Sequence, residues 1–145
     1  MSYTVSKVDI WTADIDDQVG GLATKLEPLA GAGADLDMVI ARRQPQVPGK
    51  GVVFLGPIGS AKAKQAAEIA GYRRTSEIAG LRVEGSNKPG ECGRLTRMLA
   101  DAGISLRAVS ALALGGKFVA ALAFDNDADA TKAMKVLGGG ATKKK

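Results

Sequence analysis

The sequence predicts an α+β protein made of two copies of one β-α-β-β-α-β unit, at residues 1–78 and 79–145. The chain has 145 residues, of which 46% are apolar, so each copy can bury its own core. Shifting the sequence by seventy residues against itself gives eight identities in twenty-five ungapped positions, where about two or three are expected by chance. The identical pairs are Gly20 and Gly90, Leu29 and Leu99, Ala30 and Ala100, Ala32 and Ala102, Gly33 and Gly103, Leu36 and Leu106, Val39 and Val109, and Ala41 and Ala111.

The first copy opens with a β-prone run followed by an amphipathic helix. Residues 5–11 favour a strand, and apolar residues recur at spacings of three and four over residues 19–30. Pro28 removes a backbone hydrogen bond within that helix at a cost of about 3 kcal/mol, so we expect a kink or a short break. The apolar alternation changes phase near Ser6 and Lys7, which predicts a β-bulge.

A hairpin, a second helix and a last strand complete the first copy. Residues 36–40 and 52–55 predict two strands joined by a turn-rich connection. The alanine-rich residues 61–70 favour a helix, with Ser60 as its N-cap. Residues 72–78 then predict the fourth strand of the copy.

The second copy repeats this order of elements. Its predicted elements are a strand, an amphipathic helix and two further strands, at residues 81–85, 92–102, 104–114 and 118–124. Cys92 is expected to be a small buried residue on the apolar face of that helix. Asp125 or Asp127 is expected to cap a last helix, whose apolar residues run to Leu137.

The C-terminal segment GGGATKKK predicts a poor strand, because its three glycines weaken pairing and its three lysines repel one another. We expect this basic tail to be flexible. The second copy thus lacks a proper fourth strand of its own. Either the copy is truncated, or another segment such as residues 3–5 fills the gap.

Composition narrows the classes of function. The chain has no histidine, which removes the commonest general base and transition-metal ligand, and we expect no enzymatic activity, metal or cofactor. The net charge of +5 includes the three terminal lysines, and aromatic residues make up 4%, so a nucleic-acid partner is not expected. Neither a membrane-spanning run nor a secretory leader is evident, and the one cysteine suits a reducing compartment, so we expect a cytoplasmic protein without a membrane partner.

The same strand-to-helix turn occurs once in each copy. A short polar residue, Asp17 or Asn87, is followed three residues later by Gly20 or Gly90, where a helix begins. Free N–H groups at that helix end attract a carboxylate, and the polar side chain suits an ammonium group, so an amino acid matches the turn. A tight turn needs these residue types even when nothing binds, so a purely architectural role stays open.

The segment NKPGECGRLTRMLADAGISL, residues 87–106, resembles the opening of an ACT domain, a small regulatory module. The first copy matches more loosely, with Val19 in place of the family's proline. The resemblance implies two ferredoxin-like units, each an antiparallel sheet backed by two helices, and amino-acid ligands bound near the first turn and the start of the second strand. Carried over by position, the ligand-binding candidates are Asp17, Gly20, Asp35, Asn87, Gly90 and Ser105.

The sequence therefore predicts a non-enzymatic regulatory protein that binds a small amino acid where ACT-type units meet. We expect it to form a homodimer and to act on a separate regulated protein. The alternative is an oligomerisation module whose turns bind no ligand. Asp14, Asp16 and Asp17 form a polar turn more readily than a cation site, and the pair Arg42 and Arg43 is expected to be solvated charge.

Overall fold

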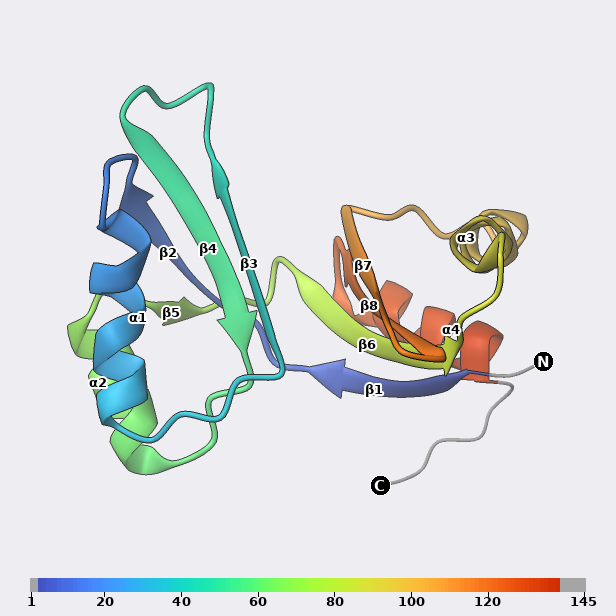
Figure 1. Cartoon of the computed structure of the whole chain (residues 1–145), viewed down its shortest axis with the longest axis horizontal. Coiled ribbons are helices and arrows are strands. Elements are labelled where there is room, and N and C mark those ends of the chain that lie inside the picture. The colour runs from blue at the N-terminus through green and yellow to red at the C-terminus, as the bar shows by residue number, and fades with distance from the viewer. Residues whose placement is uncertain (1–2, 139–145) are drawn as a thin grey trace. The chain divides into compact units, whose positions relative to one another are not determined.

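The computed structural model describes residues 3–138 and contains two compact units (Figure 1). The inserted unit is Asp9–Thr75, and the split unit is made of Met1–Val8 together with Ser76–Lys145. The boundary differs from the predicted ranges 1–78 and 79–145, because the N-terminal strand pairs with residues of the second copy. The basic tail predicted to be flexible lies outside the described residues.

The inserted unit is a four-stranded antiparallel sheet with the strand order β3-β4-β2-β5. Its elements are β2 (Trp11–Asp16), α1 (Gly21–Gly31), β3 (Met38–Arg43), β4 (Lys50–Gly56), α2 (Ala61–Ile69) and β5 (Arg73–Arg74). Both helices lie on one face of the sheet (Figure 1), and the core between the two layers includes Trp11, Leu29, Leu55, Ala67 and Tyr72.

The split unit has the same arrangement, with the strand order β1-β6-β8-β7. Its elements are β1 (Thr4–Val8), β6 (Ala79–Ser86), α3 (Glu91–Asp101), β7 (Ala108–Leu114), β8 (Lys117–Phe124) and α4 (Asp127–Gly138). The fourth strand is β1, which pairs antiparallel with β6 from Thr4 opposite Glu84 to Val8 opposite Gly80. The N-terminal run thus supplies the fourth strand of this sheet, as one of the two predicted alternatives proposed.

The phase change near Ser6 and Lys7 is not the predicted bulge. Both residues pair in continuous register, Ser6 with Arg82 and Lys7 with Leu81. The chain leaves the sheet of the split unit after Val8 and enters that of the inserted unit at Trp11. The predicted single strand at residues 5–11 therefore corresponds to parts of two strands, each with its own register.

Three sequence predictions about helices can be compared with the structure: the N-caps of α2 and α4, and the effect of Pro28 on α1. Ser60 caps α2 as predicted, since its Oγ accepts a hydrogen bond from the Ala63 amide at 3.1 Å. At α4 neither predicted aspartate is the cap, because Asn126 Oδ1 accepts from the Asp129 amide at 2.8 Å. Helix α1 is continuous from Gly21 to Gly31 with Pro28 inside it, so the predicted short break does not occur. Pro28 has no N–H to donate to the Thr24 carbonyl, so the helix loses one backbone hydrogen bond there.

Cys92 is exposed, contrary to the prediction that it is buried. The buried stripe of α3 runs through Glu91, Leu95 and Leu99, and helical spacing of about 100° per residue places Cys92 at the edge of that stripe. Cys92 lies in the first turn of the helix, where it lines a surface pocket and stays exposed. The predicted fourth strand at residues 72–78 shortens to β5, since Ala79 already begins β6. No helix among residues 3–138 is long and apolar enough to cross a bilayer.

Candidate ligand-binding turns

The two strand-to-helix turns have the same backbone geometry. Gly20 and Gly90 are the N-caps of α1 and α3, with φ angles of 84° and 86°, a left-handed conformation that favours glycine. Each turn is tied to the tip of its unit's hairpin, because the Asp17 amide donates to the Gly49 carbonyl and the Asn87 amide donates to the Gly116 carbonyl, both at 3.0 Å. The repeat seen in the sequence is therefore a repeat of structure.

Both helices begin without a side-chain cap. The first amide of each helix already donates within the turn, from Gly21 to the Gln18 carbonyl at 3.0 Å and from Glu91 to the Lys88 carbonyl at 3.2 Å. The next two N–H groups have no partner within the helix, and they lie at the positive end of its dipole. In the described part of the chain, the turns thus present backbone donors to whatever lies in front of them. This arrangement suits an anionic group such as a carboxylate.

A pocket of about 410 Å³ lies beside the turn of the inserted unit. It is lined by Ile15, Asp16, Asp17, Gln18, Leu22, Ala41, Arg42, Arg43 and Gly51. The Asp17 carboxylate, one-third exposed, pairs with Arg43 Nε at 2.7 Å. Asp16 pairs with Lys50 Nζ at 2.8 Å, and this hydrogen bond lowers the pKa of Asp16 and raises the pKa of Lys50.

A second pocket, of about 340 Å³, lies beside the turn of the split unit. Its wall is more apolar, and it is lined by Asn87, Lys88, Pro89, Gly90, Glu91, Cys92, Ala111, Leu112, Ala113 and Phe118. Unlike Asp17, Asn87 is not held by an ion pair. Its amide oxygen and nitrogen are an acceptor and a donor in one exposed side chain at the rim of the pocket.

Glu91 is a buried residue among those that line this second pocket. Its side chain is 5% exposed, and Oε1 accepts a hydrogen bond from the Tyr3 hydroxyl at 2.9 Å while Oε2 pairs with Arg94 at 2.7 Å. The Tyr3 hydrogen bond, with the Arg94 charge, lowers the pKa of Glu91. Burial, followed by the bond to Glu91, raises the pKa of Tyr3. Tyr3 also meets the ring of Phe118 edge-on, at a centroid distance of 5.8 Å.

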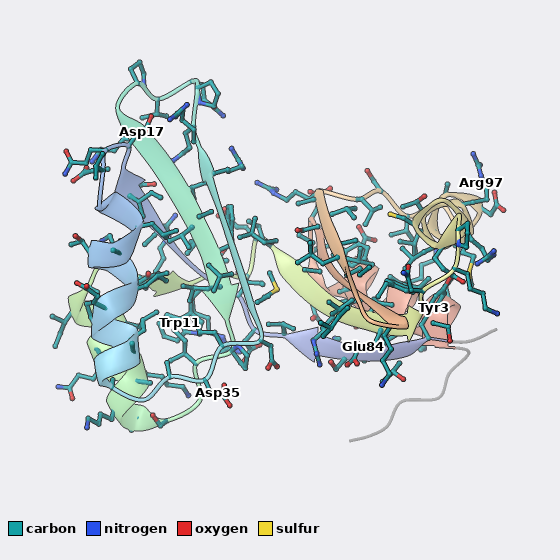
Figure 2. The ribbon with its side chains drawn as sticks, in the orientation of Figure 1. Tyr3, Trp11, Asp17, Asp35, Glu84 and Arg97 are labelled. Atoms are coloured by element: carbon teal, nitrogen blue, oxygen red, sulfur yellow. The ribbon has the colours of Figure 1, made fainter. Side chains whose placement is uncertain are left out.

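The structure brings together only part of the predicted site. Asp17 lines the pocket of the inserted unit, and Asn87 and Gly90 line that of the split unit. Gly20 is the N-cap of α1 but is not among the residues that line the pocket. Asp35 follows the far end of α1, about 16 Å along an eleven-residue helix, and Figure 2 shows Asp17 and Asp35 at opposite ends of α1. Ser105 stands in the same place after α3, and both residues are exposed and outside the two pocket linings.

Sequence reasoning missed the pairing of Asp17 with Arg43 and the buried position of Glu91. The repeat contains a signal for the pairing of Asp17 with Arg43. Ala41, two residues before Arg43, is identical to Ala111 at the seventy-residue offset, and both alanines line a pocket. Arg42 and Arg43, which follow Ala41, are predicted to be solvated charge, and the structure pairs Arg43 with Asp17. No local pattern pointed to Tyr3 as the partner of Glu91, because the two residues are 88 positions apart.

The described residues contain no group of three or more metal-ligating side chains. Each aspartate near the first turn has a different partner: Asp16 pairs with Lys50, Asp17 pairs with Arg43, and Asp14 accepts from the Gln44 amide at 3.3 Å. The three carboxylates therefore do not converge, which agrees with a polar turn.

Comparisons with known proteins identify the fold. No family model matches the chain, and no curated protein matches it by sequence. Among solved structures, the ligand-free regulatory subunit of aspartate kinase from Thermus thermophilus is 16% identical with a TM-score of 0.68, and the match covers 98% of each chain. Protein BT0572 from Bacteroides thetaiotaomicron is 15% identical with a TM-score of 0.69, over 92% of this chain and 88% of that one.

A third similar structure is a putative C-terminal regulatory domain of aspartate kinase from Porphyromonas gingivalis W83, which is 13% identical with a TM-score of 0.58, over 94% and 95% of the two chains. The chain has the tandem ACT fold. The predicted fold class, two ferredoxin-like units with helix-backed antiparallel sheets, is thereby confirmed. The two turns described above occupy equivalent positions, one in each unit of this fold.

Proposed function

We propose that this protein is a non-enzymatic, cytoplasmic regulator that binds a small amino acid at its ACT-type turns and acts as a homodimer on a separate protein. The observation that carries the proposal is the pairing, in each unit, of an uncapped helix N-terminus with a polar side chain at the rim of a pocket. Pockets of about 340 and 410 Å³ are large enough for one amino acid.

The ligand carboxylate would accept hydrogen bonds from the second and third amides of α1 or α3, because the first amide of each helix already donates within its turn. The ligand ammonium group would meet Asp17 or Asn87. In the inserted unit, an ammonium group must displace Arg43 from Asp17, and the released guanidinium would then be free to contact the ligand carboxylate. In the split unit, Asn87 is available without such an exchange. Ligand binding by the split unit therefore requires less rearrangement.

Asp35 and Ser105 complete the proposed set, but neither reaches the turn of its own unit. They would contact a ligand only when another ACT-type unit is placed against the turn, as a second copy of the chain would do. Such a ligand would favour one arrangement of units over another, which is the thermodynamic requirement for a regulatory signal.

The test is a thermal-shift screen of the purified protein against the twenty amino acids. At one hundred times its dissociation constant, a ligand that binds only the native state adds about 2.7 kcal/mol to the free energy of unfolding. We expect at least one amino acid to raise the melting temperature, and Asn87→Ala or Asp17→Ala to abolish the shift. Glu68→Ala, an exposed change on α2 away from both pockets, serves as the control and should keep it.

A flat screen with a well-folded protein would refute ligand binding and leave a second function, an oligomerisation module. One observation favours that alternative independently: β7 is an apolar strand with all seven residues exposed. The turns would then serve only to connect strands to helices.

A further inference from the structure

We propose that the inserted unit binds a small phenol, an aromatic ring that carries a hydroxyl group, in a cavity between α1 and the end of α2. The cavity has a volume of about 300 Å³, and the residues that line it include Asp16, Gly21, Thr24, Lys25 and Ala70. A phenol bound there would not require the amino acid of the proposed function. The two units of the chain fill this position of the fold differently.

In the split unit, a tyrosine side chain packs beside the first turn of α3. The Tyr3 hydroxyl donates to Glu91 Oε1 at 2.9 Å, and Glu91 Oε2 pairs with Arg94 at 2.7 Å. The Tyr3 ring is buried and belongs to the core of the unit. The fold thus already accommodates one phenol ring, whose hydroxyl is held by a carboxylate that is itself paired with a guanidinium.

The helix of the inserted unit has smaller side chains at the two positions that hold this phenol. At the seventy-residue offset of the repeat, Gly21 corresponds to Glu91, and Thr24 corresponds to Arg94. A Cβ added at Gly21 would lie 2.0 Å from the Asp16 carbonyl oxygen, so this position cannot hold a side chain unless the backbone shifts. Neither the carboxylate nor the guanidinium of the split unit therefore has a counterpart in α1.

The phenol itself is also missing from the inserted unit. Strand β5 pairs with β2 as β1 pairs with β6, and at the offset of the repeat the two registers make Arg74 the counterpart of Lys7. Four residues earlier in each segment, Ala70 is the counterpart of Tyr3. Ala70, Gly21 and Thr24 all line the cavity, so the space lies where the split unit has its tyrosine network. A cavity of about 300 Å³ is at the lower end of the range for small-molecule sites, which suits a single ring.

A carboxylate and an ammonium group face this cavity from other positions. Asp16 Oδ1 pairs with Lys50 Nζ at 2.8 Å, and the carboxylate has further lone pairs for a second donor. Lys25 Nζ donates to the Ala70 carbonyl, which uses one of its three N–H groups. A hydroxyl group both donates and accepts, so it matches Asp16 together with Lys25. The ring would pack against Pro28, which also lines the cavity, and against the aliphatic part of Lys25.

The test is an amide NMR titration of the native chain with p-cresol, which is the tyrosine side chain without its backbone. We expect the resonances of residues 21–27 and 70–72 to shift. Toluene has the same ring and methyl group but no hydroxyl. It should bind at least about tenfold more weakly, because hydrogen bonds to charged groups are stronger than those between neutral groups.

A pair of variants on α1 tests the position of the ring. Thr24 is exposed at the cavity, and Thr24→Phe fills the space with a ring of the chain itself, so it should abolish the response to p-cresol. Ala23→Phe adds the same ring at the neighbouring residue, which is exposed and lines none of the three cavities described above. This matched control should keep the response of the native chain.

Three results would overturn the phenol site: unchanged resonances at residues 21–27 and 70–72, an equal affinity for toluene, or equal loss of the response in both variants. The first two are measured on the native chain and do not depend on the folding of a variant. A response to p-cresol together with a flat amino-acid screen would support the phenol site and refute the amino-acid ligand. The opposite pair of results would refute the phenol site alone, so the two proposals fail separately.

Discussion

At the scale of single residues, Glu91 shows how the split unit is held together. A buried carboxylate is destabilising unless it is fully paired, and both oxygens of Glu91 have partners in Tyr3 and Arg94. Tyr3 precedes the strand that joins this unit from the other end of the chain. The hydrogen bond therefore ties the N-terminal segment to the helix that forms the candidate site.

The pH dependence of stability should report this contact. The pKa of Glu91 is lowered in the folded state, so its stabilising contribution is present above the ordinary value of 4.5 and is lost as the pH falls through the folded pKa. We expect the melting temperature of Glu91→Gln to fall less steeply than that of the native protein between about pH 5 and pH 3. Tyr3→Phe, which removes one of the two partners, should be intermediate, and parallel curves for all three proteins would contradict the assignment.

The backbone of the turn gives a second residue-scale prediction. Gly90 has a φ of 86°, where a side chain costs about 1–2 kcal/mol, so Gly90→Ala should destabilise the protein by that amount. Gly93 is the matched control, because it lies inside the same helix with open space where a Cβ would be placed. Gly93→Ala should stabilise by up to about 1 kcal/mol in chemical denaturation. Equal effects would show that the turn conformation is not the cause.

At the scale of secondary-structure elements, strand β1 is the element that the sequence left open. Val5 is buried in the core of the split unit, opposite Val83 of β6. Val5→Asp places an unpaired charge in that core and should cost several kcal/mol. Hydrogen exchange should show lost protection in β6 and β8, with protection retained in β2 and β4. Ser6→Asp, exposed and opposite Arg82, is the control, and equal loss in both sheets would contradict the division into units.

The elements could be predicted where the signal is local. Helical spacing, the Ser60 cap and the alternation in the hairpins depend on neighbours within a few residues, and these predictions agree with the structure. The placement of β1 in the second sheet could be predicted only as one of two alternatives, because strand pairing joins residues about eighty positions apart and leaves no local pattern. The structure bears out the alternative in which the N-terminal run supplies the missing strand. The burial of Cys92 was predicted wrongly because spacing alone places it beside the buried stripe, whereas its position in the first turn of α3, at a surface pocket, leaves it exposed.

Four of the six candidate residues, namely Asp17, Gly20, Asn87 and Gly90, belong to the two turns, and the other two do not. The two turns were found because glycine and a short polar residue recur at a fixed spacing. Asp35 and Ser105 came from position in a family pattern, and the fold places them at the far ends of α1 and α3. A pattern in one chain cannot reveal residues that meet only when a second copy is present.

At the scale of the whole molecule, the two units share one backbone fold, but their pockets are lined by different residues. The inserted unit presents Asp17 already paired with Arg43, whereas the split unit presents a free amide and an apolar edge strand. The units should therefore differ in ligand response. We expect the split unit to respond first, because binding there breaks no ion pair.

The most direct test of amino-acid binding is an amide NMR titration of the 14.9 kDa chain with each of the twenty amino acids at millimolar concentration. The account predicts that one of them shifts the amide resonances of residues 87–93, with those of residues 17–23 responding at the same or higher concentration. Spectra that stay unchanged for all twenty, from a folded and assigned protein, would contradict the claim that this protein binds an amino acid at its turns.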